Sequence, residues 1–221
     1  LVAVISYRLR FLDLGGAVMS FVLGTLIFGL GGWPFSLPIL AFFVLSSLLS
    51  RFGILQKQAA NENFQKGHRR DLGQVLANGG IPAVILVLWH FAPQPFWYFL
   101  YLGALAAVTA DTWATEIGLL SHGLPRSITS WQVVAKGTSG AISGLGMLGG
   151  LFGALSIAVI GWAVRYHDPI HAFNWQGIML IVSSAMAASL FDSFLGATIQ
   201  AQQTCTVCHK VSESKGTCCG V

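Results

Sequence analysis

Charged side chains are scarce in this sequence. Only 9% of its 221 residues are Asp, Glu, Lys or Arg, and 54% are hydrophobic, whereas a soluble domain carries roughly 25% charged residues. The mean hydropathy is +0.70. Because several uncharged runs are also long, a water-soluble globular domain is excluded, and we expect an integral membrane protein.

The sequence also lacks an initiator methionine. It begins inside an apolar run from Leu1 to Tyr7. We expect this run to be the end of a helix whose start is missing, and no signal peptide can be recognised from it.

Apolar runs that approach the length of a membrane helix recur along the chain. Such a helix needs ~20 mostly apolar residues, and the runs cover residues 14–32, 34–50, 75–92, 95–112, 141–164 and 176–199. Turn-forming residues separate them at Gly31–Pro34 and Ala92–Pro95. The expected fold is an all-α polytopic membrane bundle of about six helices, formed by residues 1–200 and followed by a Cys-rich tail over 201–221.

Threading these runs alternately through a membrane puts the basic residues on one side. The exception is Arg165; the other Lys and Arg residues are Arg8, Arg10, Arg51, Lys57, Lys66, Arg69, Arg70, Arg126, Lys136, Lys210 and Lys215. The positive-inside rule makes this side cytoplasmic. The net charge of +4 is therefore a signal of topology, and a nucleic-acid partner is not needed to explain it.

Three carboxylates lie in or beside the apolar runs. Asp111 and Glu116 belong to the stretch TADTWATEIG over 109–118, and Asp192 interrupts the last run. Ionisable groups in a membrane are rare and usually face a protein interior or a cavity. We predict that the three carboxylates meet as catalytic Mg²⁺ ligands, because Mg²⁺ takes hard oxygen ligands and shares them with substrate phosphates. The alternatives are an ordinary polar helix end and an Asp192 that pairs with a basic residue.

The first inner loop supplies candidate phosphate contacts. These are Lys57, Lys66, Arg69, Arg70, Gln74 and Asn78. Alternatively, the Lys and Arg residues of this loop would bind anionic lipid at the membrane surface. The two amides are four residues apart and so share a helix face, where they would bind a nucleotide or cap a neighbouring helix.

A second candidate anion site precedes the run over 141–164. It consists of Lys136, Gly137, Thr138, Ser139 and Ser143. Free N–H groups at a helix N-terminus favour phosphate. It is not a P-loop, because the Lys precedes the glycines. Together with the carboxylates, these residues predict phosphoryl or nucleotidyl transfer, which depends on positioning and on neutralisation of phosphate charge.

The motifs QVLANGG, ADTWATEIG, GTSGAIS and FDSFLGATIQ occur in this order over nearly the whole chain. They resemble the membrane family (domain of unknown function 92) that includes transmembrane protein 19 and the phytyl-phosphate kinases. The resemblance implies transfer of a phosphoryl group from CTP or ATP to a prenyl monophosphate such as phytyl phosphate, giving the diphosphate used in tocopherol synthesis. The polar pattern is also distantly similar to CTP-using prenol kinases and lipid cytidylyltransferases. A non-enzymatic transporter or scaffold for isoprenoid lipids is the remaining alternative.

The resemblance has two departures. Asp71 stands where the family is expected to have Asn, and the chain stops at Val221, where members continue into a further membrane segment with an Asn-rich motif. We expect a protein of a bacterial inner membrane or chloroplast envelope, with its site facing the cytoplasm or stroma. Homodimerisation is left open.

The four cysteines all follow residue 204. Cys205, Cys208 and His209 form a CxxCH sequence, and Cys218 and Cys219 follow. CxxCH alone is typical of covalent haem, but the predicted cytoplasmic side argues against haem attachment and against stable disulfides. Cys205, Cys208 and Cys218 are candidate Zn²⁺ ligands, and reduced thiols without metal are the open alternative.

Overall fold

A computed structural model describes residues 1–52, 69–165, 174–199, 203–204 and 211–212. The predicted all-α membrane bundle is confirmed: the described residues form six helices, and α2, α4, α6 and α7 are each long and apolar enough to cross a membrane. The helices are α1 (Val2–Arg8), α2 (Leu14–Arg51), α4 (Leu72–Phe91), α5 (Pro95–Gly118), α6 (Gly144–Arg165) and α7 (Trp175–Thr198).

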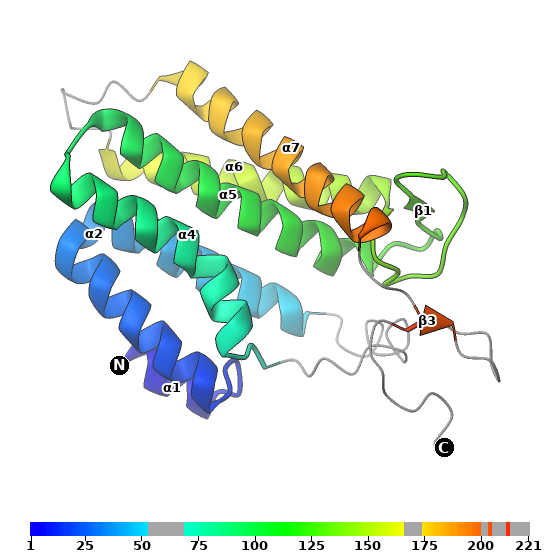
Figure 1. Ribbon diagram of the computed structural model, residues 1–221, viewed down its shortest axis with the longest axis horizontal. Coiled ribbons are helices and arrows are strands. Elements are labelled where there is room, and N and C mark those ends of the chain that lie inside the picture. The colour runs from blue at the N-terminus through cyan, green and yellow to red at the C-terminus, as the bar shows by residue number, and fades with distance from the viewer. Residues whose placement is uncertain (53–68, 166–173, 200–202, 205–210, 213–221) are drawn as a thin grey trace.

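Helix α2 folds back on itself at the predicted turn. Gly32 has a φ of 60° and a ψ of −156°, outside the helical range. A straight helix of 38 residues would be ~57 Å long. Nevertheless the Arg51 guanidinium donates a hydrogen bond to the Leu9 carbonyl and lies 3.9 Å from the centroid of the Phe11 ring. The two ends of α2 are therefore close together, and its two arms correspond to the predicted runs 14–32 and 34–50 (Figure 1).

Helix α5 is the centre of the bundle. It contacts α2, α4, α6 and α7, and in Figure 1 it lies between α4 and α7. Tyr101, Leu102, Leu105 and Ala106 are fully buried along it. The position of α5 matters because its last turns carry Asp111 and Glu116.

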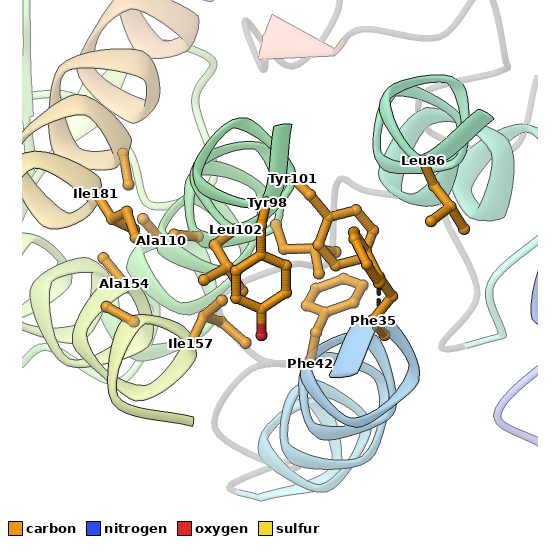
Figure 2. Close-up of a cluster of buried hydrophobic side chains, with 14 of the residues drawn as sticks. Phe35, Phe42, Leu86, Tyr98, Tyr101, Leu102, Ala110, Ala154, Ile157 and Ile181 are labelled. Atoms are coloured by element: carbon orange, nitrogen blue, oxygen red, sulfur yellow. Dashed lines mark hydrogen bonds between the residues drawn. The ribbon is translucent and has the colours of Figure 1, made fainter. Parts of the chain in front are cut away.

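Aromatic residues fix the α2 turn against the first half of α5. The Tyr101 hydroxyl donates to the Phe35 carbonyl over 2.6 Å, and the Tyr98 hydroxyl donates to the carbonyls of Pro34 and Gly161 over 3.2 and 3.3 Å. Figure 2 shows Phe35, Tyr98 and Tyr101 packed together in the core. This end of the bundle is thus held by aromatic packing and hydrogen bonds to backbone carbonyls, and the carboxylates of α5 lie at the other end.

Glycines on α6 allow it to approach α5 closely. A Cβ added at Gly146 would lie 2.7 Å from the Ala114 carbonyl oxygen, and one added at Gly149 would lie 2.9 Å from the Trp113 carbonyl oxygen. Gly146 and Gly150 are four residues apart, as are Gly149 and Gly153, and small residues at that spacing permit such backbone contact between membrane helices. The contact holds the stretch of α5 between Asp111 and Glu116.

A small strand pair lies between α5 and α6. β1 (Arg126–Ser127) pairs antiparallel with β2 (Ala141–Ile142), with Arg126 opposite Ile142. In the tail, β3 (Gln203–Thr204) pairs antiparallel with β4 (Val211–Ser212). Neither strand pair was predicted from the sequence.

Candidate functional site

The ends of several helices place basic and acidic residues together. Arg51 ends α2, Arg70 precedes α4, Glu116 lies in the last turn of α5, and Lys136 contacts the carbonyls that follow α5. Arg165 ends α6 at the opposite side of the bundle. This charged end lies to the right in Figure 1, and its cytoplasmic orientation stays a prediction.

Asp111 and Asp192 form a carboxylate pair between α5 and α7. The two charges are close enough to repel each other, and the Ser189 hydroxyl donates a hydrogen bond to Asp111. Ser189 is buried and Asp192 is exposed. Because Ser189 and Asp192 are three residues apart, they share one face of α7. The result is two carboxylates and one hydroxyl at a single helix contact.

Glu116 lies apart from this pair. It follows Asp111 by five residues and is therefore rotated by roughly 140° around α5. Its Oε1 accepts a hydrogen bond of 2.6 Å from the Ser50 hydroxyl of α2, and its charge acts on Arg70. Within the described ranges, no group of three or more His, Cys, Asp or Glu residues could hold a metal ion. The structure thus brings together two of the three predicted carboxylate ligands, Asp111 and Asp192, but not the third.

Arg70 is a poorly solvated cation beside Glu116. Its backbone N–H donates to the Phe11 carbonyl over 2.9 Å, and its guanidinium carbon lies 5.4 Å from the centroid of the Phe42 ring. Its Nη2 is buried and has no hydrogen-bond partner among the described residues. Burial lowers the pKa of Arg70, and the charge of Glu116 opposes that shift. Such a cation would gain from an anionic ligand.

The predicted amides lie at the start of α4. Asp71, the departure from the family pattern, caps this helix: its Oδ1 accepts a hydrogen bond of 2.8 Å from the Gln74 backbone N–H. Asn78 lines the same cavity as Arg70, while Gln74 is half-buried outside it. Arg69 is exposed. Of this group, Arg70 and Asn78 are therefore brought together.

Polar groups of the predicted anion loop already donate hydrogen bonds to backbone carbonyls. The Lys136 ammonium donates to the carbonyls of Leu119 (3.3 Å) and Ser121. The Thr138 hydroxyl donates to the Ala135 carbonyl over 2.8 Å. An anion at Lys136 would have to compete with these carbonyl contacts.

The far end of this loop packs on α7. Gly137 and Gly140 have positive φ angles of 81° and 73°, and a Cβ added at Gly140 would lie 2.7 Å from the Ser193 carbonyl oxygen. The Ser143 hydroxyl accepts a hydrogen bond of 3.1 Å from the Gly146 N–H and so caps α6. The loop that contains Ser139 therefore reaches the residue next to Asp192.

Two serines of α2 that were not predicted as site residues donate to or accept from side chains of α5. Ser50 binds Glu116, and the Ser46 hydroxyl accepts a hydrogen bond of 3.1 Å from Trp113 Nε1. Their spacing of four residues places them on one helix face. Two hydroxyls four residues apart in an otherwise apolar run were the feature of the sequence from which these contacts could have been predicted. Lys57, Lys66, Cys205, Cys208 and Cys218 lie outside the described residues.

Comparison with known proteins assigns the chain to a family of membrane proteins. The model of integral membrane protein DUF92 matches residues 1–220. Protein PGR of Arabidopsis thaliana is 32% identical over 98% of this chain and 81% of its own length. Membrane protein MJ0933 of Methanocaldococcus jannaschii is 33% identical over 90% of this chain and 79% of its own length.

A more distant relative is Protein VTE6, chloroplastic, of Arabidopsis thaliana, which is 26% identical over 86% of this chain and 56% of its own length. No solved structure matches. The family match spans nearly the whole chain and agrees with the apolar helices described above. This chain therefore belongs to the integral membrane protein DUF92 family.

Proposed function

We propose that this protein transfers a phosphoryl group from a nucleoside triphosphate to a prenyl monophosphate, with phytyl phosphate as the first substrate to test. The observation that carries the proposal is the pair Asp111–Asp192, in which Ser189 bonds Asp111, at the same end of a membrane bundle as the half-buried cation Arg70. Hard oxygen ligands and a cation for phosphate are the groups that phosphoryl transfer requires. The resemblance of the motifs to phytyl-phosphate kinases supports the choice of substrate.

The carboxylate pair fits Mg²⁺. Mg²⁺ is commonly held by one or two carboxylates together with substrate phosphates and water, and two carboxylates that repel each other gain from a shared cation. In the proposal Asp111 and Asp192 hold Mg²⁺, and the Ser189 hydrogen bond orients Asp111. When bound, the ion neutralises the charge on the phosphates.

The remaining residues bind and orient the phosphates. Arg70 contacts the phosphate of the lipid, and Glu116, itself held by Ser50, orients the guanidinium. In the reaction, an oxygen of the prenyl monophosphate attacks the γ-phosphorus of the nucleotide. The bond between that phosphorus and the bridging oxygen breaks, and a nucleoside diphosphate leaves. Lys57, Lys66 and Lys136 remain candidates for the nucleotide phosphates.

The test is a transfer assay with purified protein, phytyl phosphate and nucleotide labelled either at the γ- or at the α-phosphate. The proposal predicts that only the γ-label enters the lipid, as phytyl diphosphate. Entry of the α-label would indicate nucleotidyl transfer and contradict it. Binding of the lipid without entry of either label would contradict enzymatic function.

A further inference from the structure

An elongated cavity runs beside α2, separate from the Asp111–Asp192 pair. Its volume is about 690 Å³, inside the range of ~300–1,000 Å³ typical of ligand pockets. Leu12 and Arg70 line it at the charged end, and Phe28 and Trp33 line it next to the α2 turn. Because these residues lie at opposite ends of an α2 arm, the cavity extends along the direction in which α2 crosses the bundle.

The cavity is mostly apolar, with hydroxyls at Ser20, Thr25 and Ser36, and it is cationic at one end. Its lining includes Phe21, Leu23 and Phe42, whereas Arg70 is the charged residue among those that line it. The Nη2 atom of Arg70 is buried without a hydrogen-bond partner in the described structure. Burying such a group unpaired costs free energy, and a phosphate oxygen would supply the missing acceptor. The cavity is thus complementary to a molecule with a single apolar chain and an anionic head.

We propose that this cavity holds the hydrocarbon chain of a prenyl monophosphate, with the lipid phosphate against Arg70 and therefore beside Glu116. The identity of the lipid rests on the proposed function, while the location and chemistry of the pocket rest on the cavity itself. A single elongated space, with a cation at one end whose Nη2 lacks a hydrogen-bond partner among the described residues, favours a one-chain phosphate monoester over a two-chain phospholipid.

Two exposed glycines in the lining accept a side chain at the cavity without a steric clash. A Cβ added at Gly24 or at Gly29 meets no atom within 4 Å, and both residues line the cavity. Gly24→Phe therefore extends a ring into open space. Val22→Phe is the matched control, because Val22 lies on the same arm of α2, is 52% exposed and does not line the cavity.

The experiment measures binding of tritiated geranylgeranyl phosphate to the purified protein in detergent, without nucleotide. We expect Val22→Phe to bind as wild type does and Gly24→Phe to bind at least about 10-fold more weakly. Arg70→Gln should weaken binding of geranylgeranyl phosphate but not of geranylgeraniol, which has no phosphate. Equal binding by Gly24→Phe and Val22→Phe would overturn the proposal, as would displacement by phosphatidic acid as effective as by unlabelled geranylgeranyl phosphate.

Gly29→Leu serves as an independent cavity-filling variant if Gly24→Phe does not purify as a monodisperse protein. Measurement of diphosphate formation then distinguishes failure of the lipid pocket from failure of the proposed kinase function. Loss of binding in the filled variants, with no diphosphate formed by wild type, rejects the kinase and keeps the lipid pocket. Diphosphate formation with an unchanged KM in the filled variants rejects the pocket and keeps the kinase.

Discussion

At the scale of single residues, the candidate site is divided between two faces of α5. Asp111 faces Asp192 and Ser189 on α7, while Glu116 faces Ser50 on α2 and the Arg70 guanidinium. We interpret the first face as the side that holds a metal ion and the second as the side that orients the lipid phosphate. The two faces make different predictions.

The carboxylate pair should determine binding of a divalent cation. We expect Asp192→Asn to weaken binding of Mn²⁺, used as a substitute for Mg²⁺, by at least about 10-fold in the presence of nucleotide, because one of two carboxylate ligands is lost. Electron paramagnetic resonance of free Mn²⁺ measures this directly. Asp71→Asn is the matched control, since Asn caps a helix as well as Asp does; equal weakening by both variants would contradict the assignment.

The second face should show energetic coupling between Glu116 and Arg70. Glu116→Gln removes the negative charge that stabilises the Arg70 guanidinium and offsets the cost of its burial, so we expect a lower melting temperature in detergent. In a double-mutant cycle with Arg70→Gln, residues that interact directly should show a coupling energy of about 0.5–3 kcal/mol. Additive effects of the two substitutions would show that the pair does not interact.

At the scale of helices, close contact between α5 and α6 holds the site residues in register. Gly146→Ala would place a methyl group 2.7 Å from the Ala114 carbonyl oxygen, so we expect α6 to shift and the melting temperature to fall. Gly144→Ala is the control on the same helix, because a Cβ there meets no atom within 4 Å. Similar melting temperatures for both variants would contradict the close-contact account.

The helices themselves could be predicted from the sequence. The apolar runs and their Gly/Pro breaks correspond to the two arms of α2 and to α4, α5, α6 and α7. The reason is that hydrophobic length and turn residues are local properties of the chain. The pair β1–β2 was missed because each strand has two residues, too few for an alternating pattern.

The composition of the site could be predicted only in part. Depth in the membrane follows from position along each run, and the structure places Asp111 and Asp192 near each other. Which residues actually meet depends on the rotation of each helix. The spacing of five between Asp111 and Glu116 already implied different faces, whereas the contact between Ser50 and Glu116 depends on packing between α2 and α5.

At the scale of the whole molecule, the charged end should face the cytoplasm. After replacement of the native cysteines by serine, we expect Ser130→Cys, in the exposed loop after α5, to react with a membrane-impermeant thiol reagent only from the cytoplasmic side. Gln94→Cys, in the exposed connection between α4 and α5, should react only from the opposite side. The reverse pattern in oriented vesicles would contradict the predicted topology.

The central claim is that Asp111 and Asp192 act together in transferring a phosphoryl group to a prenyl phosphate. The most direct measurement is formation of phytyl diphosphate from γ-labelled nucleotide by wild type, Asp111→Asn, Asp192→Asn and Asp71→Asn, each verified as folded by its melting temperature. The account predicts turnover in wild type and Asp71→Asn, and a loss of at least about 100-fold in the other two, because electrostatic stabilisation of the transferred group is a large share of catalysis. Turnover close to that of wild type in either Asp111→Asn or Asp192→Asn would contradict it.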